Sequence, residues 1–198
     1  MIDTLNKHIE EAENENQKQI AYRNKLLFLI GINIGIRASD LRALKWNFFL
    51  KDNGEFKEFY TFQPKKQRKQ NKFVKLYFNQ TVKKAITDYI NIYPINNMED
   101  YLFPSRKGNE SITVDRICIV VKKIAKESGI EKNVGSHSLR KTWGFWIWHN
   151  AIDKNKALVM LQECFKHSST TVTLRYIGIL DEEKKDMYES IDLGLDYI

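Results

Sequence analysis

The chain has 198 residues, of which 42% are hydrophobic, and this is enough for one sizeable core of an ordinary globular protein. No stretch reaches the roughly 18 uncharged apolar residues that a membrane span needs, and the polar, acidic N-terminus does not resemble a secretory signal. We therefore expect a cytoplasmic protein with no membrane partner. Cys118 and Cys164 lie in apolar helical patterns without CxxC spacing, which predicts buried reduced thiols and no metal site.

The net charge of +7 is unevenly distributed along the chain. Residues 1–19 carry −3 and residues 181–198 carry −5, so residues 20–180 hold +15. A basic body between acidic ends indicates a polyanionic partner. A lysine-rich solvated surface would give the same count, and charge alone leaves both interpretations open.

The first elements in chain order are helical. A polar, helix-permitting stretch at about 2–18 precedes an apolar run at 21–34, which predicts a buried helix. Gly35 stands where a C-terminal cap would end that helix. Ser39 can cap the short helix that follows, with Asp40 in its first turn.

Three short strands are predicted next, because aromatic and β-branched residues gather there between turn signals. They cover residues 48–50, 56–62 and 73–78. Asp52-Asn53-Gly54 supplies the first turn, and the basic segment PKKQRKQNK, residues 64–72, forms the tip of the second.

The rest of the chain has helical periodicity. The predicted helices cover residues 81–93, 113–127, 138–150, 154–163, 170–176 and about 181–191. Thr113 caps the second of them. The sequence therefore predicts a mainly α fold with a small antiparallel three-stranded sheet (α+β), as a single domain over residues 1–198.

Three segments carry the chemistry: GIRASDLRAL at 35–44, HSLRKT at 137–142 and HSSTTVTLRY at 167–176. Alone, each is most simply a surface or packing feature. In this order they resemble the tyrosine recombinase, or phage integrase, family. Its pattern is G-x-R-x-x-E/D, a hairpin lysine, H-x-x-R, then H/W followed nine residues later by Tyr. The resemblance covers about residues 20–180 and implies the catalytic-domain fold of DNA breaking-rejoining enzymes.

The resemblance implies that Arg37 and Arg140 hold the scissile phosphate and that His167 adds a hydrogen bond to it. Electrostatics supports this assignment, because a phosphodiester is an anion whose non-bridging oxygens gain further negative charge in the transition state. Without a metal, guanidinium groups must neutralise that charge, and their planar fork matches phosphate oxygens bidentately.

Tyr176 is the nucleophile that the resemblance implies. An unperturbed phenol has a pKa of about 10, so it needs a base or positive surroundings at neutral pH. His137, one helical turn before Arg140, can take the proton, and Asp40 can orient Arg37 or His137. A hairpin lysine protonates the leaving 5′ oxygen in this family; Lys66 is our first choice and Lys65 the second.

The other basic residues of the hairpin tip are predicted to bind DNA. They are Lys65, Arg68, Lys69 and Lys72.

Two positions depart from the family pattern. Family members usually have Leu-Gly-His where this chain has Phe165-Lys166-His167, and the glycine permits a tight turn from helix to loop. The third strand usually ends Val-Pro-Leu, whereas Val74-Lys75-Leu76 stands here.

The resemblance also implies partners and assembly. We expect double-stranded DNA as the partner, a monomer or weak dimer in solution, and a homo-tetramer on paired DNA sites. No N-terminal core-DNA-binding domain is expected. The acidic tail, residues 181–198, offers Met187, Ile191 and Leu193 for docking on a neighbouring subunit; docking in cis and a solvated terminal helix are the alternatives.

The implied product is a 3′-phosphotyrosyl link and a free 5′ hydroxyl, so rejoining needs no ATP, metal or other cofactor. The sequence has no P-loop, no dinucleotide glycine motif and no carboxylate cluster for two magnesium ions. The alternatives are a type IB topoisomerase-like enzyme and a non-catalytic DNA-binding regulator.

Overall fold

The computed structural model describes residues 1–64, 73–105 and 110–191, of which 181–183 are described by their backbone alone. The chain forms two compact units, Met1–Arg140 and Lys141–Ile198. None of the helices that the structure describes has the length and apolar character that a membrane crossing requires.

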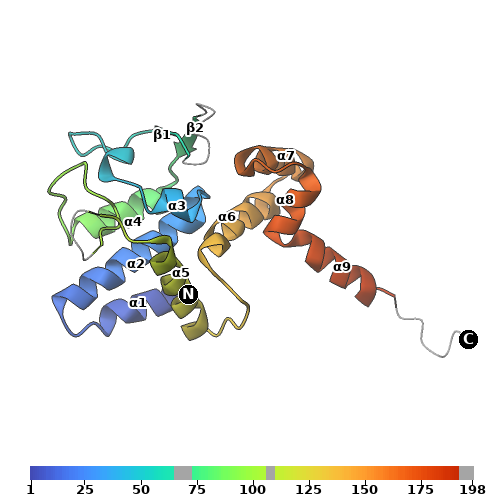
Figure 1. The fold of residues 1–198 in the computed structure, drawn as a ribbon, viewed down its shortest axis with the longest axis horizontal. Helices are drawn as coiled ribbons and strands as arrows, with labels where there is room; N and C mark the ends of the chain where they lie inside the picture. The colour runs from blue at the N-terminus through green and yellow to red at the C-terminus, as the bar shows by residue number, and fades with distance from the viewer. Residues whose placement is uncertain (65–72, 106–109, 192–198) are drawn as a thin grey trace, which may run out of the picture. The chain divides into compact units, whose positions relative to one another are not determined.

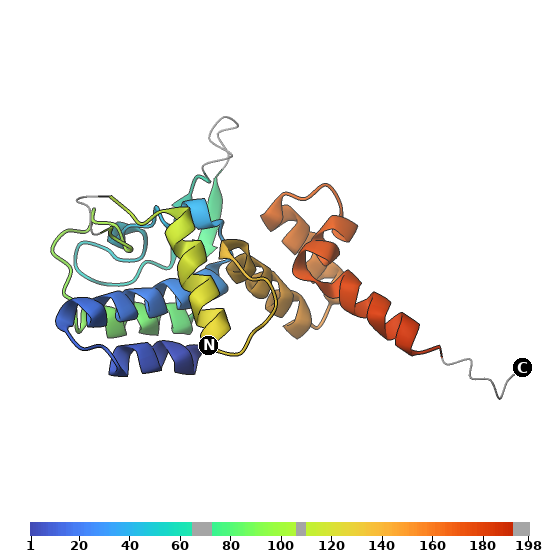
Figure 2. The same ribbon diagram turned by 60° about the horizontal axis from the view of Figure 1, so that its bottom comes forward.

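The first unit is mainly helical (Figures 1 and 2). Its described helices are α1 (Ile2–Glu10), α2 (Glu15–Ile34), α3 (Ala38–Leu41), the 3-10 turn η1 (Trp46–Phe48), α4 (Gln80–Ile90), α5 (Val114–Glu127) and the first turn of α6 (Ser136–Asn150). Helix α2 packs against α1 and α4, and α5 lies across them. Side chains with no exposed surface come from each, including Leu5, Leu27, Ile86 and Ile117. Periodic apolar residues thus build one core, as the sequence predicts.

Helix ends in this unit follow their capping residues. Gly35 ends α2 in the left-handed conformation, with φ 69°, and the Thr113 side chain accepts a hydrogen bond from the backbone N–H of Arg116 at the start of α5. Both predicted caps are confirmed. The predicted cap Ser39 is wrong: α3 begins at Ala38 with Arg37 as its capping residue, and no side chain caps it.

The predicted three-stranded sheet is wrong, because the described residues form two strands only. These are β1 (Phe59–Phe62) and β2 (Val74–Tyr77), antiparallel, with Phe59 opposite Tyr77. The predicted strand at 48–50 is instead the end of η1 and a single bridge between Leu50 and Phe56. Consecutive Phe49 and Leu50 are both buried, and a strand cannot bury two neighbours on one face because its side chains alternate.

The second unit has its own small core. It contains the remainder of α6, then α7 (Lys154–Phe165), α8 (Thr170–Ile177) and α9 (Ile179–Glu189). Leu161, Phe165, Ile177 and Ile179 are buried together, and α7 packs on α8. The expectation of buried cysteines does not hold, because Cys164 is exposed and Cys118 only half-buried; both lie on helix faces that border solvent.

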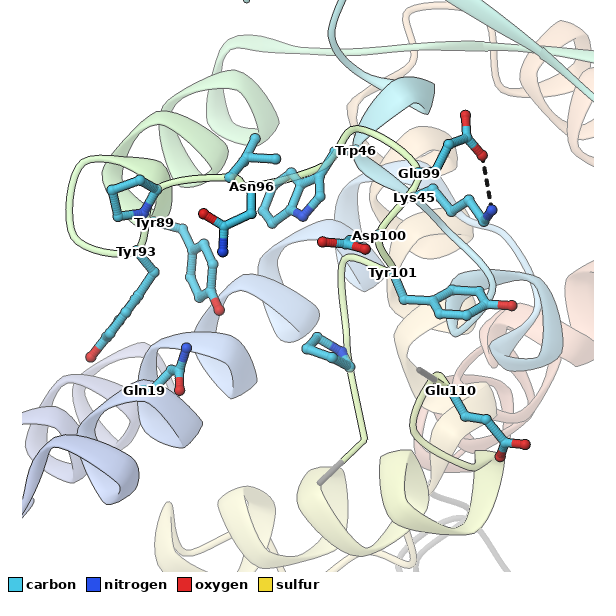
Figure 3. A pocket seen from close by; sticks show the side chains of 13 residues that line it. Gln19, Lys45, Trp46, Tyr89, Tyr93, Asn96, Glu99, Asp100, Tyr101 and Glu110 are labelled. Atoms are coloured by element: carbon cyan, nitrogen blue, oxygen red, sulfur yellow. Dashed lines mark hydrogen bonds and ion pairs between the residues drawn. The ribbon is translucent and has the colours of Figure 1, made fainter. Parts of the chain in front are cut away.

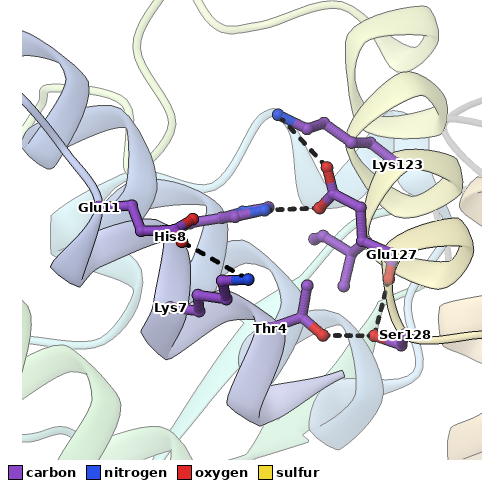
Figure 4. A network of polar contacts seen from close by, with 8 residues as sticks. Thr4, Lys7, His8, Glu11, Lys123, Glu127 and Ser128 are labelled. Atoms are coloured by element: carbon purple, nitrogen blue, oxygen red, sulfur yellow. Dashed lines mark hydrogen bonds and ion pairs between the residues drawn. The ribbon is translucent and has the colours of Figure 1, made fainter.

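Polar contacts fasten α1 to the end of α5 (Figure 4). The Thr4 and Ser128 hydroxyls are 2.6 Å apart, and His8 Nε2 lies 2.5 Å from a Glu127 carboxylate oxygen. Lys123 Nζ lies 3.7 Å from the other oxygen of Glu127. One carboxylate therefore joins two helices that are far apart in sequence.

We predict that Glu127→Ala lowers the free energy of unfolding by about 0.5 to 1 kcal/mol, the range for partly exposed ion pairs. Urea denaturation measures it. Glu131→Ala, which removes an exposed carboxylate just beyond the helix, is the control and should change stability little. Equal effects of the two substitutions would mean that the α1–α5 contact contributes nothing.

Candidate active site

The first candidate residues lie where α2 ends. After Gly35 the chain turns, and the backbone N–H groups of Asp40 and Leu41 both donate to the Arg37 carbonyl, at 2.9 and 2.8 Å. Ala38 and Leu41 are buried and anchor this turn in the core. The Arg37 backbone is therefore fixed, with its side chain half-buried.

The second group lies on the first turn of α6. The Gly135 N–H donates to Ser138 Oγ at 3.0 Å, which stabilises the start of the helix. His137 and Arg140 follow at positions i and i+3, which are neighbours on a helix surface. His137 is exposed, whereas Arg140 is only 6% exposed.

Helices α2 and α6 approach each other closely, and this contact connects the turn at Arg37 with the turn that carries His137 and Arg140. A Cβ on Gly31 of α2 would lie 2.7 Å from Leu139 Cδ1 of α6, so any larger residue at position 31 would force the Leu139 side chain to shift. Leu139 directly precedes Arg140, and Gly31 lies one turn before Gly35. The contact thus brings the end of α2, which leads to Arg37, toward the turn that carries His137 and Arg140.

Two charged side chains, Asp40 and Arg140, are buried in the first unit, and buried charges are typical of a binding or catalytic site. Asp40 is 4% exposed and Arg140 6% exposed, and each residue has an interaction partner. Charged side chains are almost never so buried unless paired. A solvated surface is therefore not the right description of these two positions.

The last two candidates meet in the second unit. The ring centroids of His167 and Tyr176 are 5.0 Å apart with planes at 71°. Phe165 packs edge-on to Tyr176, also at 5.0 Å. The nine-residue spacing therefore places the imidazole against the phenol ring.

Thr173, which the sequence interpretation did not single out, orients His167. Its side chain has no exposed surface, its hydroxyl lies 3.1 Å from His167 Nδ1 and it donates to the Ser169 carbonyl at 3.2 Å. The His167 backbone N–H donates to the Gln162 carbonyl at 3.1 Å. Because the Thr173 hydroxyl gives its proton to the Ser169 carbonyl, it accepts a hydrogen bond from Nδ1–H of His167. The only signal in the sequence is the helical spacing of Thr173 from Ser169.

The family glycine is replaced by Lys166, but the turn it permits is kept. Lys166 is the C-cap of α7 with φ 57° and ψ 47°, the left-handed conformation. It is the one non-glycine residue with positive φ in the described backbone. Its ammonium pairs with Glu163. The loop therefore takes the shape that glycine would give, at a conformational cost.

Lys65, Lys66, Arg68, Lys69 and Lys72 lie outside the described residues. Across the part of the chain that the structure describes, no three His, Cys, Asp or Glu side chains gather as a metal site would require.

A large depression in the first unit contains none of the candidate residues (Figure 3). It has a volume of about 520 Å³ and lies between α2 and the loops after α4, beside Trp46, Tyr89 and Asp100. Lys45 Nζ lies 2.9 Å from Glu99, and this hydrogen bond raises the pKa of Lys45 and lowers that of Glu99. Its polar side chains are mostly exposed, so it is an open surface hollow.

Comparison with known proteins identifies the class. The model of the "Phage integrase family" matches residues 2–183. The chain therefore belongs to the phage integrase family and is, by family, a site-specific recombinase of the tyrosine type. The predicted family, enzyme class and catalytic-domain fold are confirmed.

Two relatives and two solved structures show the extent of the similarity. The "Probable integrase/recombinase YoeC" of Bacillus subtilis is 28% identical over 84% of this chain and 83% of its own length. The "Tyrosine recombinase XerH" of Campylobacter jejuni is 27% identical over 92% of this chain and 49% of its own. A XerH structure in a post-cleavage complex with palindromic difH superposes with a TM-score of 0.63 at 21% identity, over 96% of this chain and 51% of that one.

The Tn1549 transposon integrase, in complex with circular intermediate DNA, superposes with a TM-score of 0.57 at 16% identity, over 96% of this chain and 64% of that one. The chain thus spans most of the Bacillus relative, but about half the length of the two XerH proteins. At these identities the structures establish the fold.

We predict that Gly31→Ala destabilises the chain. Replacing a helix-interior glycine with alanine usually gains about 1 kcal/mol, but overpacking against buried Leu139 costs about 1 to 3 kcal/mol. A net loss of up to about 2 kcal/mol should appear in urea denaturation, whereas Gln19→Ala, on the exposed face of α2, should be neutral. A more stable Gly31→Ala variant would refute the close contact.

We predict that Thr173→Val lowers stability by about 1 kcal/mol, because the hydrogen bonds of a fully buried hydroxyl to His167 and to the Ser169 carbonyl are lost, although that carbonyl keeps the backbone N–H of residue 173. It should also change the balance of His167 tautomers, which ¹⁵N NMR can resolve because the chain has only four histidines. Thr173→Ser keeps the hydroxyl and should keep the wild-type tautomer. An unchanged His167 spectrum in Thr173→Val would show that Thr173 does not orient the ring.

Proposed function

We propose that this chain cleaves and rejoins double-stranded DNA through a covalent 3′-phosphotyrosine at Tyr176. The observation that carries the proposal is the packing of Tyr176 against His167 at the family spacing, with a buried threonine holding the imidazole. DNA as the substrate is supported by the XerH and Tn1549 integrase complexes, both of which contain DNA.

The proposed cleavage step is an in-line displacement at phosphorus. Tyr176 Oη attacks the scissile phosphate, and its proton passes to His137. The bond between phosphorus and the 5′ oxygen breaks, and a hairpin lysine, Lys66 or Lys65, donates a proton to that oxygen. Rejoining is the reverse, with a 5′ hydroxyl attacking the phosphotyrosine, so bond energy is conserved and no cofactor enters.

The arginines supply the electrostatic stabilisation. Arg37 and Arg140 would hold the non-bridging oxygens, and His167, in its doubly protonated form, would add a hydrogen bond from Nε2 to the same phosphate. Fixed donors stabilise the transition state because they need not reorganise as charge develops. The anchored turn at Arg37 and the buried position of Arg140 support this role, and Asp40 would hold one of these groups in place.

We propose further that four copies assemble on paired DNA sites through α9, as one catalytic domain each. Met187 and Ile191 are 53% and 63% exposed at the end of the chain's described part. The same unit carries an apolar depression of about 390 Å³ between α6 and α7, beside Ile147 and Met160, with Asp153 and Lys156 also in its lining. An acidic helix with an apolar side fits that surface on a second copy. The chain alone would be a monomer or weak dimer.

Covalent trapping tests the chemistry. Nicked duplexes, selected by the chain itself from a random pool, should yield a protein–DNA adduct with the phosphate on Tyr176 by mass spectrometry. Tyr176→Phe should bind the same duplexes normally and form no adduct, whereas Tyr188→Phe, on exposed α9, should form it. A regulator would be indifferent to Tyr176→Phe, and a phosphate on another tyrosine would contradict the assignment.

Assembly has its own prediction. Met187→Ser with Ile191→Ser, or Met160→Ser alone, should spare binding to one site and reduce the joining of two sites at least tenfold. Ile152→Ser removes a fully exposed apolar side chain outside the depression and should have no effect. If the variant with Met187→Ser and Ile191→Ser recombines paired sites as well as wild type, the tail is a solvated end of the chain.

A further inference from the structure

Lys141 lies over the ring of the proposed nucleophile. Its Nζ is 5.5 Å from the centroid of the Tyr176 ring, and both residues belong to the second unit. Lys141 directly follows Arg140 on α6, within the segment HSLRKT, but no catalytic role was expected of it. Its side chain is exposed, and the described residues include no carboxylate paired with it.

The other described side chains around the Tyr176 ring are uncharged or are paired with each other. Phe165 and His167 contact the ring edge-on at 5.0 Å and bring no permanent charge. The charged residues at the end of α7, Glu163 and Lys166, pair with each other. On α9 the side chains of residues 181–183 lie outside the described structure. Within the second unit, Lys141 therefore places a permanent positive charge over the Tyr176 ring.

We propose that Lys141 is a positioning residue for strand cleavage: its ammonium holds the Tyr176 ring and stabilises the phenolate that attacks the phosphate. The inference rests on the proposed function and deepens it. A cation is attracted to the face of an aromatic ring, and the attraction strengthens when the hydroxyl loses its proton because the ring system then carries a full negative charge. The proton goes to His137, and the oxygen's new charge is consumed as its bond to phosphorus forms.

Lys141 directly follows Arg140, so α6 can carry both the proposed phosphate ligand and the cation beside Tyr176. Successive residues on a helix point about 100° apart, so Arg140 and Lys141 face different directions from neighbouring positions. Arg140 is buried in the first unit and Lys141 reaches the tyrosine of the second. A positive charge for the phosphate and another for the nucleophile thus come from adjacent residues.

Lys141→Met tests the proposal, because it keeps an unbranched apolar stem and removes the charge. The positive charge favours the deprotonated phenol, so its loss should move the rising limb of the pH–rate profile for cleavage to higher pH. At neutral pH and low salt we expect cleavage to be about threefold slower, the size of one screened charge at this distance. At high pH the rates should converge, and added salt should shrink the difference. Lys141→Arg should retain the wild-type profile.

Lys126→Met is the matched control, since Lys126 is an exposed lysine on α5 in the first unit. It removes the same charge from the chain and should leave the profile in place. A lysine that only bound DNA backbone would behave differently: its loss would weaken affinity at every pH and lower the salt dependence of binding. An unshifted profile with weakened affinity would overturn the proposal.

A measurement without DNA separates this inference from the proposed function. In protein with ¹³C-labelled tyrosine rings, the Tyr176 resonance is identified by its absence in Tyr176→Phe. It should titrate at lower pH in wild type than in Lys141→Met. Identical titrations would overturn the role of Lys141, whereas failure of the wild-type chain to form any adduct would overturn the proposed function.

Discussion

The contact between Gly31 and Leu139 is the constraint on which the candidate site depends. It brings α2 so close to the first turn of α6 that a side chain on residue 31 would displace Leu139. The end of α2 leads into the anchored turn of Arg37, and Leu139 is the neighbour of Arg140. The core of the first unit thus positions the backbone at Arg37 and at Arg140 by the packing of the helices that precede and carry them.

Helix α6 begins in the core of the first unit and continues into the separate, aromatic core of the second unit. Its first turn is held in the first unit, whereas Trp143 packs edge-on to Phe165 at 5.8 Å in the second. Phe165 in turn contacts both His167 and Tyr176. Tyr176, the proposed nucleophile, is therefore positioned by a small aromatic cluster built from α6, α7 and α8, and not by the larger core. A phenol fixed this way has its orientation defined by ring packing, while its hydroxyl depends on polar neighbours.

The sequence predicted the helices well because their signals are local. Periodic apolar residues, the Thr113 cap and the Gly35 terminator each act within a few residues, and the structure agrees with them. The strand at 48–50 failed because its three residues read equally as a helical turn, and the packing of Phe49 and Leu50 in the core decided the matter. Tertiary burial overrides short-range propensity in such short segments.

The candidate site likewise has one part that local sequence signals predict and another part that depends on tertiary packing. The motifs identified the family and named the candidate residues, since spacing along the chain is visible in a sequence. The contacts that support them were not predictable: Thr173 meets His167, and Lys141 meets Tyr176, only after α6, α7 and α8 pack together. Such partners come from other turns or other helices, and their residue types are common on any helix surface.

The left-handed Lys166 has a consequence for how this family varies. A backbone conformation is preserved here while the residue that usually signals it is not, so a motif that insists on glycine before the histidine would overlook this chain. Asparagine or aspartate could take the same place, because their short polar side chains tolerate positive φ, whereas valine or isoleucine could not. In this chain the loop before His167 depends on the left-handed backbone of residue 166, and a residue able to adopt that conformation can bring the histidine to the phenol.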